Sequence, residues 1–163
     1  MKKLLHNQSG VSIIELLVAL GIFSIFIAMA VSGFVQAVSG QKLILLLMEA
    51  NDSASLALEQ MSREIRTAEP GQIETGAGSI KIEGPTGTVT YALSGGVIER
   101  NGYPVTTDNS NITIARFETD RVPFGSGNER VLVFITTEVR YKDLDPIQTN
   151  LQTSITPRIY YGN

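Results

Sequence analysis

Cysteine is absent from this sequence of 163 residues, and histidine occurs once, as His6. Without a thiol, the chain has no cysteine nucleophile and no zinc site built on thiolates. With its one histidine at the N-terminus, the rest of the chain cannot form a Ser-His-Asp triad. Acidic residues remain for acid-base chemistry, but the spacing of Asp and Glu does not single out a pair. The chain is therefore predicted to be no enzyme and to hold no cofactor or metal.

A strongly basic segment is also missing. The formal net charge is −3, and 18% of the residues are charged. Because nucleic-acid binding depends on clustered Lys and Arg, we predict no nucleic-acid partner. Asp108, Asn109, Asp143 and Asp145 carry the oxygen atoms that calcium prefers, but we interpret them as solvated turn residues.

The sequence does contain one long apolar run, from Gly10 to Phe34, in which Glu15 is the only formal charge. About 24 residues of helix extend over about 36 Å, which exceeds the roughly 30 Å of a bilayer's hydrocarbon core. The run is therefore predicted to be a membrane helix. A carboxylate inside it costs up to about 3 kcal/mol, so Glu15 calls for a partner or a function.

The cations around this run predict its direction. Lys2 and Lys3 precede it, and the next cation, Lys42, follows it. Because positive residues stay on the cytoplasmic side, we expect a single-pass protein of the cytoplasmic membrane with its N-terminus inside. The chain beyond about residue 40 is expected outside.

The order of residues in this region is specific. A short leader with lysines ends at Gly10, an apolar residue follows, Glu15 stands at the fifth place after the glycine, and the apolar helix continues. This arrangement resembles the N-terminus of type IV pilins and type II secretion pseudopilins. The resemblance implies that a prepilin peptidase cuts after Gly10 and methylates the new terminus on Val11. Val11 departs from the family pattern, which has Phe or Met more often.

The same resemblance implies that Glu15 pairs with the processed amino terminus, commonly on a neighbouring subunit. An ammonium and a carboxylate carry opposite charges at neutral pH. In a water-poor bundle each offsets part of the other's desolvation.

A secretory signal peptide is the alternative for this segment, because Ala28, Met29 and Ala30 satisfy a small-x-small cleavage pattern. The chain would then be a β-rich binding module, exported by a signal peptide or anchored in the membrane. The run is longer than the usual apolar region of about 7 to 15 residues, contains Glu15 and continues past Ala30. We therefore favour cleavage after Gly10.

The helical pattern continues beyond the apolar run. Residues 41–68 contain no Pro or Gly, and a core stripe is predicted at Leu47, Ala50, Ala54, Ala57 or Leu58, Met61, Ile65 and Ala68. Glu49, Asp52, Ser55, Glu59, Arg63 and Arg66 are expected to face water. One helix of about 58 residues is the simplest interpretation, and Pro70 and Gly71 end it. Because pilins soften this helix on assembly, the resemblance implies softening near Ser32 and Gly33.

After Pro70 the apolar period changes to two, which predicts strands. The expected strands are Ser79 to Glu83, Thr88 to Leu93, Val97 to Arg100, Ile112 to Thr119, Val131 to Tyr141 and Leu151 to Pro157. Hairpin turns are expected at residues 84–87, 94–96 and 101–102, and a slip in the alternation falls at Ala115. The predicted class is α+β, a pilin-like long helix packed against an antiparallel sheet. The predicted parts are a leader (1–10), a transmembrane half of the helix (11–40), an amphipathic half (41–69) and a β-rich domain (70–163).

Two further stretches, Met61 to Ala68 and Tyr91 to Gly102, resemble minor pseudopilins of the J type and minor pilins of the W type. The resemblance implies a structural minor subunit, with prepilin peptidase, other pilin or pseudopilin subunits, an inner-membrane assembly platform and membrane lipid as partners. Arg63, Glu64 and Arg66 are candidates for subunit contacts, and exposed helix charges are the alternative interpretation. A secretion system, a pilus and a DNA-uptake machine all remain open.

Overall fold

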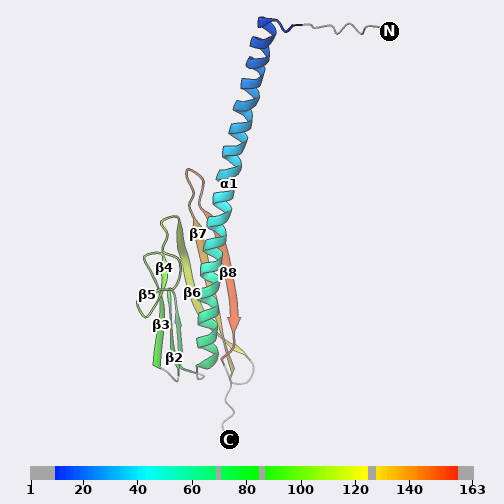
Figure 1. Cartoon of the computed structure of the whole chain (residues 1–163). Helices are drawn as coiled ribbons and strands as arrows, with labels where there is room; N and C mark the ends of the chain where they lie inside the picture. The colour runs from blue at the N-terminus through cyan, green and yellow to red at the C-terminus, as the bar shows by residue number, and fades with distance from the viewer. Residues whose placement is uncertain (1–9, 69–70, 85–86, 125–127, 158–163) are drawn as a thin grey trace, which may run out of the picture. The chain divides into compact units, whose positions relative to one another are not determined.

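The computed structural model describes residues 10–68, 71–84, 87–124 and 128–157 (Figure 1). Its elements are α1 (Ile13–Thr67), β1 (Ile73–Gly76), β2 (Ser79–Gly84), β3 (Gly87–Ser94), β4 (Val97–Arg100), β5 (Tyr103–Pro104), β6 (Ile112–Phe124), β7 (Asn128–Val139) and β8 (Ile147–Ile155). Most of the predicted leader, Pro70 and the middle of the predicted turn at 84–87 lie outside the described residues. The predicted α+β class is confirmed, with a long helix and antiparallel strands.

The helix α1 is continuous over 55 residues, as the uninterrupted apolar and amphipathic patterns predicted. The chain divides into two compact units between Lys42 and Leu43, and α1 contributes to both. In the first unit the large apolar side chains of α1 are exposed; Ile13, for example, is 80% exposed. By length and composition α1 is able to cross a membrane.

The part of α1 in the second unit buries one stripe and exposes the opposite face. The buried residues of the stripe are Ala50, Ala54, Ala57, Leu58, Met61 and Ile65, and Ala68 just after the helix is buried too. All six polar residues that were predicted to face water are exposed: Glu49, Asp52, Ser55, Glu59, Arg63 and Arg66. Leu47, which was also predicted for the stripe, is only half-buried, against the smaller cluster of Ala50, Ile112 and Val139. The rest of the amphipathic pattern is confirmed.

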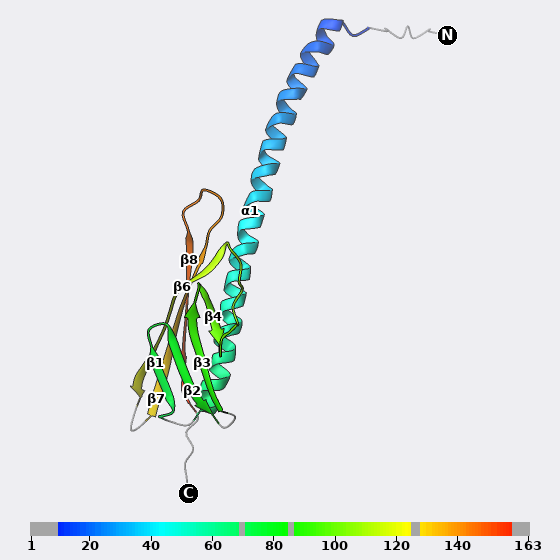
Figure 2. The ribbon, with the colours of Figure 1, turned by 90° about the vertical axis from the view of Figure 1, so that its left-hand side faces the viewer.

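The strands form two antiparallel sheets where the sequence predicted one. The first has the order β1-β2-β3-β4-β5 and the second the order β6-β7-β8. Backbone hydrogen bonds join them at β6, because the Gly78 amide donates to the Phe117 carbonyl at 2.8 Å and the Ile114 amide to the Gly96 carbonyl at 2.7 Å. Figure 2 shows both sheets on the same side of this part of α1.

The main core lies between α1 and both sheets. Met61 and Ile65 of α1 pack in the same buried cluster as Tyr91 of the first sheet and Phe117 and Ile135 of the second. The alternation of apolar residues in the strands provides this buried face. The helix therefore closes the core that the sheets alone leave open.

Several strand bounds differ from the sequence prediction. The short strands β1 and β5 were not predicted, and β6 extends five residues past the predicted end at Thr119, because its pairing with β7 continues to the partners Phe124 and Asn128. β7 ends at Val139 rather than Tyr141, and Lys142 has a left-handed φ of 53° in the turn that follows. The prediction of β8 was wrong at both ends, because pairing with β7 starts at Ile147 and ends at Ile155.

Other local predictions are confirmed. The slip at Ala115 is a register shift between Ile114 and Arg116, and it leaves Ala115 exposed. Asn101 and Gly102 form the turn between β4 and β5 with φ of 51° and 84°, as expected for a tight hairpin. Gly95 and Gly96 also have positive φ, between β3 and β4.

Candidate functional site

Glu64 lies in the penultimate turn of α1 and is bonded to the first sheet. Its Oε1 accepts hydrogen bonds from Arg100 Nε at 3.0 Å and Arg100 Nη2 at 2.8 Å. The Glu64 side chain is 21% exposed and that of Arg100 34% exposed, so this ion pair is shielded in part from solvent. The hydrogen bond to Glu64 raises the pKa of Arg100. The charged pair therefore fixes α1 against β4.

Tyr91 lies beside this ion pair and is fully buried. Its hydroxyl and Glu64 Oε2 are both buried without a hydrogen-bond partner. Burial raises the pKa of Tyr91 far above its ordinary value, and the nearby charge of Glu64 adds to this effect. The sequence pattern places Glu64 with Arg63 and Arg66 and gives no sign of Arg100 and Tyr91, which are 36 and 27 positions away in the chain.

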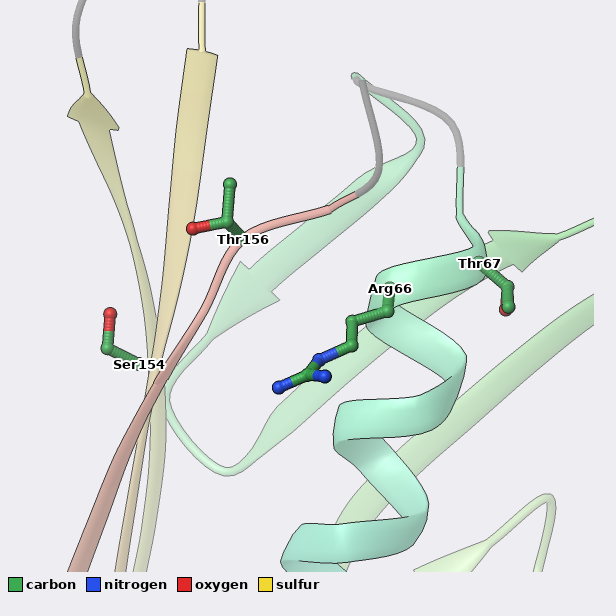
Figure 3. A pocket seen from close by; sticks show the side chains of 4 residues that line it. All are labelled: Arg66, Thr67, Ser154 and Thr156. Atoms are coloured by element: carbon green, nitrogen blue, oxygen red, sulfur yellow. The ribbon is translucent and has the colours of Figure 1, made fainter. Parts of the chain in front are cut away.

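Arg63 and Arg66 are exposed, as the sequence predicted. Arg63 Nη2 lies 4.0 Å from Glu59 Oε1 in an exposed i,i+4 pair. Arg66 lines a pocket with Thr67, Ser154 and Thr156, and its side chain extends from the last turn of α1 towards the end of β8 (Figure 3). Among the described residues, no acidic group is paired with Arg66.

At the other end of α1, Gly10 and Val11 precede the helix and are exposed. Val11 is 71% exposed. A Cβ added to Gly10 would meet no atom within 4 Å, and the φ of Gly10 is not positive. Neither packing nor backbone geometry in the described chain therefore requires glycine at this position.

Glu15 lies in the first turn of α1. It shares a helix face with Ile14, Val18, Ala19 and Ile22, whose side chains line a groove with almost no polar atoms. Among the described residues Glu15 has no hydrogen-bond or ion-pair partner. A carboxylate is thus held, without a counter-charge, on an apolar face within two turns of the scissile bond predicted after Gly10.

Ser12 is a residue of this region that sequence analysis missed. Its carbonyl accepts the first helical hydrogen bond, from the Leu16 amide at 3.1 Å, so Ser12 is the N-cap of α1. Ser12 and Glu15 have the Ser-x-x-Glu spacing of a helix N-terminus, which is the signal that predicts this position. The acid also faces the positive end of the helix dipole.

Ser32 and Gly33 lie within the regular part of α1, and a Cβ added to Gly33 would meet no atom within 4 Å. The helix is unbroken there. Softening at this pair upon assembly stays a prediction.

The comparison with protein families gives one match, the prokaryotic N-terminal methylation motif, over residues 5–31. The chain carries this methylation motif. Together with the long apolar helix α1, the motif is consistent with a type IV pilin-like protein, which confirms the resemblance drawn from the sequence. The chain matches neither a curated protein nor a solved structure.

The methylation motif covers 27 of the 163 residues and includes Gly10, Val11 and Glu15. It is typical of the substrates of a prepilin-type peptidase, and it favours a structural subunit. Within the ranges that the structure describes, no three of His, Cys, Asp and Glu come together as a metal site. Asp108, Asp143 and Asp145 are exposed there.

Proposed function

We propose that this chain is a minor pilin-like subunit, processed after Gly10 and assembled through α1 into a pilus or a type II secretion pseudopilus. The observation that carries the proposal is the unpartnered Glu15 on an apolar helix face, next to an exposed Gly10–Val11 segment inside the methylation motif. J-type pseudopilins and W-type minor pilins are the subunits that the sequence resembles.

Cleavage supplies the charge that Glu15 lacks. Cutting the peptide bond after Gly10 makes Val11 the first residue, and its amino group is protonated at neutral pH. A carboxylate at the centre of a membrane helix costs about 3 kcal/mol and one near its end costs less, and an ammonium within contact distance offsets part of this cost. We propose that the ammonium comes from a neighbouring subunit, so that the ion pair forms only on assembly.

The requirement for glycine at position 10 then comes from the peptidase. Position 10 has open space around it and no positive φ, so the folded chain accepts a side chain there. A peptidase active site that is too narrow for a side chain at this position would account for the glycine. The exposure of both Gly10 and Val11 leaves the bond accessible to an enzyme.

The proposed orientation has the leader in the cytoplasm and residues 43–163 outside, because Lys2 and Lys3 precede the apolar part of α1. The proposed partners are a prepilin peptidase, the inner-membrane assembly platform, membrane lipid and other pilin-like subunits. Arg63 and Arg66 on the exposed face of α1 are proposed subunit contacts, while Glu64 is engaged with Arg100. Softening near Ser32 and Gly33 would let α1 adapt to the filament.

Processing of a Gly10→Val variant tests the proposal, with Gly21→Val as the matched control. Neither position has an atom within 4 Å of an added Cβ, so both variants keep the fold of the chain. Mass spectrometry and N-terminal sequencing of the wild-type protein are expected to show N-methylated Val11 as the first residue. Gly10→Val is expected to accumulate uncut, and Gly21→Val is expected to be cut normally.

Other results would contradict this function. A mature protein that begins after Ala30 would indicate an exported binding module. A chain that keeps residues 1–10 in cells that assemble filaments would indicate a simple membrane anchor. Normal cutting of Gly10→Val would show that the peptidase does not read this glycine.

A further inference from the structure

The outer edge of β8 differs from every other sheet edge in the described part of the chain. β8 spans Ile147–Ile155, and its sequence, IQTNLQTSI, contains no charged residue, no glycine and no proline. It is the last strand of the second sheet, after β7. Outside the ladder with β7, no backbone hydrogen bond joins β8 to any described residue.

The remaining edges carry features that prevent strand addition. β5 has two residues, one of them Pro104, and β1 has four. β6 contains the irregularity at Ala115, several charged side chains and Pro123, and its Phe117 carbonyl already accepts a hydrogen bond from the Gly78 amide. Natural proteins use short strands, prolines, bulges and charges to keep sheet edges from pairing with other chains. β8 has none of these protections over nine residues, or about 30 Å of strand.

The two faces of β8 have different characters. Gln148, Asn150 and Gln152 are exposed on one face, and Gln148 Nε2 donates to Glu138 Oε2 of β7 at 2.9 Å. On the other face Ile155 is buried, and Leu151 is half-buried against the main core. An added strand would therefore extend the core with every second side chain. Those side chains are expected to be apolar, and the ones between them polar.

The flank of α1 next to this edge contributes a cation. Glu64 accepts hydrogen bonds from Arg100 of β4, and Ser53 accepts one from the Thr107 amide just after β5, so their flank of α1 faces the first sheet and the segment that follows it. Residues two positions apart on a helix lie about 200° apart, so Arg66 is on the opposite flank from Glu64. There it lines the pocket with Ser154 and Thr156 at the end of β8 (Figure 3). A strand on β8 would pass this guanidinium, which pairs with no acid among the described residues.

We propose that β8 is a docking edge for an extended segment of a different, neighbouring filament subunit, which adds a fourth strand to the second sheet and places an acidic side chain beside Arg66. Backbone hydrogen bonds along β8 would provide the affinity of the contact. The alternating faces of β8 and the charge of Arg66 would provide its specificity for one segment. This inference rests on the proposed function, because it requires that the chain assembles with other subunits.

Hydrogen exchange of the full-length chain tests the proposal directly, in isolated filaments and in detergent micelles. Peptides that cover β8 are expected to exchange at least tenfold more slowly in the filament, because the outer amides gain acceptors. Peptides of β3 are the internal control, since this strand is already paired on both sides by β2 and β4. Equal exchange of β8 in the two states would overturn the proposal.

Two neighbouring substitutions test the same edge in the assembled protein. Thr153→Lys places a cation on the half-buried, core-side face, which an added strand would cover, whereas Gln152→Lys places it on the exposed face of the same strand. We expect Thr153→Lys to lower incorporation into filaments at least tenfold and Gln152→Lys to leave it within twofold. Unchanged exchange of β3 in Thr153→Lys shows that the fold is kept, and normal incorporation of that variant would overturn the docking edge.

A photo-crosslinking amino acid at Gln152 identifies the occupant. Crosslinks that map by mass spectrometry to an extended segment of another filament subunit support the proposal. Crosslinks to lipid alone, or to a second copy of this chain alone, overturn it. If filaments contain the processed chain but β8 stays unprotected, only this inference fails; if the processed chain is absent from filaments, the proposed function fails as well.

Discussion

Two glutamates of α1 have opposite relations to the rest of the chain. Glu64 accepts two hydrogen bonds from Arg100 on the first sheet, whereas Glu15 has no partner among the described residues. The first acid obtains a counter-charge, Arg100, from folding alone. The second lies on an apolar face, where an unpaired charge is costly, and we propose that its partner comes from processing or assembly.

Glu15→Gln keeps the shape of the side chain and removes its charge. We expect the variant to be inserted and cut after Gly10 like the wild type, but to enter filaments at least tenfold less, because the processed terminus then lacks its counter-charge. Quantification of the chain in the membrane and filament fractions measures both steps. Glu49→Gln, on the exposed face in the second unit, is the control. Normal assembly of Glu15→Gln would contradict the pairing.

Tyr91 is expected to make the free energy of unfolding fall at alkaline pH. Its pKa is raised by burial, so the folded state keeps the phenol protonated where the unfolded chain, with a pKa near 10, ionises. The associated stability is complete below about pH 10 and is lost as the pH rises from there towards the pKa of the folded state.

Tyr91→Phe is expected to weaken this alkaline loss. It removes a buried hydroxyl without a hydrogen-bond partner, so the free energy of unfolding below about pH 10 should stay equal or rise by up to about 1 kcal/mol. Thermal unfolding of the full chain in detergent micelles, from about pH 8 to about pH 11, measures both effects. Tyr103→Phe is the control, because Tyr103 is 75% exposed. An unchanged alkaline profile in Tyr91→Phe would show that another group causes the loss.

At the scale of elements, the two faces of α1 in the second unit differ in burial and therefore in what they contribute to the protein. Met61 is fully buried in the core between the helix and the sheets, whereas Leu56, five residues earlier, is 65% exposed. Burial of the first stabilises the unit itself. Exposure of the second leaves it available to a neighbour.

Met61→Ala is therefore expected to lower the free energy of unfolding by about 2 to 5 kcal/mol, because it leaves a cavity in a closely packed core. Leu56→Ala is expected to change it by less than about 0.5 kcal/mol. Thermal or denaturant unfolding of the two full-length variants, followed by the circular dichroism of the strands, compares them. Similar losses in both would show that the exposed face also contributes to the unit's stability.

The elements differ in how well the sequence predicts them. The helix was predicted within a few residues, because its apolar periodicity is local and long. The two-residue strand β5 exists only because the turn at Asn101 and Gly102 returns the chain onto β4, where Arg100 pairs with Tyr103. The start of β8, Ile147 to Asn150, is exposed and mostly polar, so pairing with β7 rather than apolar alternation places it in the sheet.

At the scale of the whole molecule, the two units have different physical requirements. Residues 43–163 bury a core of their own between α1 and the sheets, whereas the described part of residues 1–42 exposes almost all of its apolar side chains. Such a surface is stable in lipid or against other apolar helices. The chain thus joins a folded unit to a segment whose exposed apolar side chains need lipid or other apolar helices around them.

The candidate site was predicted from the sequence only where its signals are contiguous. Gly10, Val11 and Glu15 were predicted from their spacing within six residues, and all three lie inside the methylation motif at residues 5–31. The link from Glu64 to Arg100, the place of Tyr91 beside it and the exposed edge of β8 depend on which strands become neighbours. Sequence periodicity indicates a buried face, but it does not specify the order of strands in a sheet.

The alanines of the buried stripe have a consequence for how this protein can vary. Ala50, Ala54 and Ala57 are at most 1% exposed, so a methyl group already fills the room that each position offers. A bulkier residue at any of them would push the helix off the strands and cost about 1 to 3 kcal/mol. Among descendants of a common ancestor, these three sites should therefore stay small.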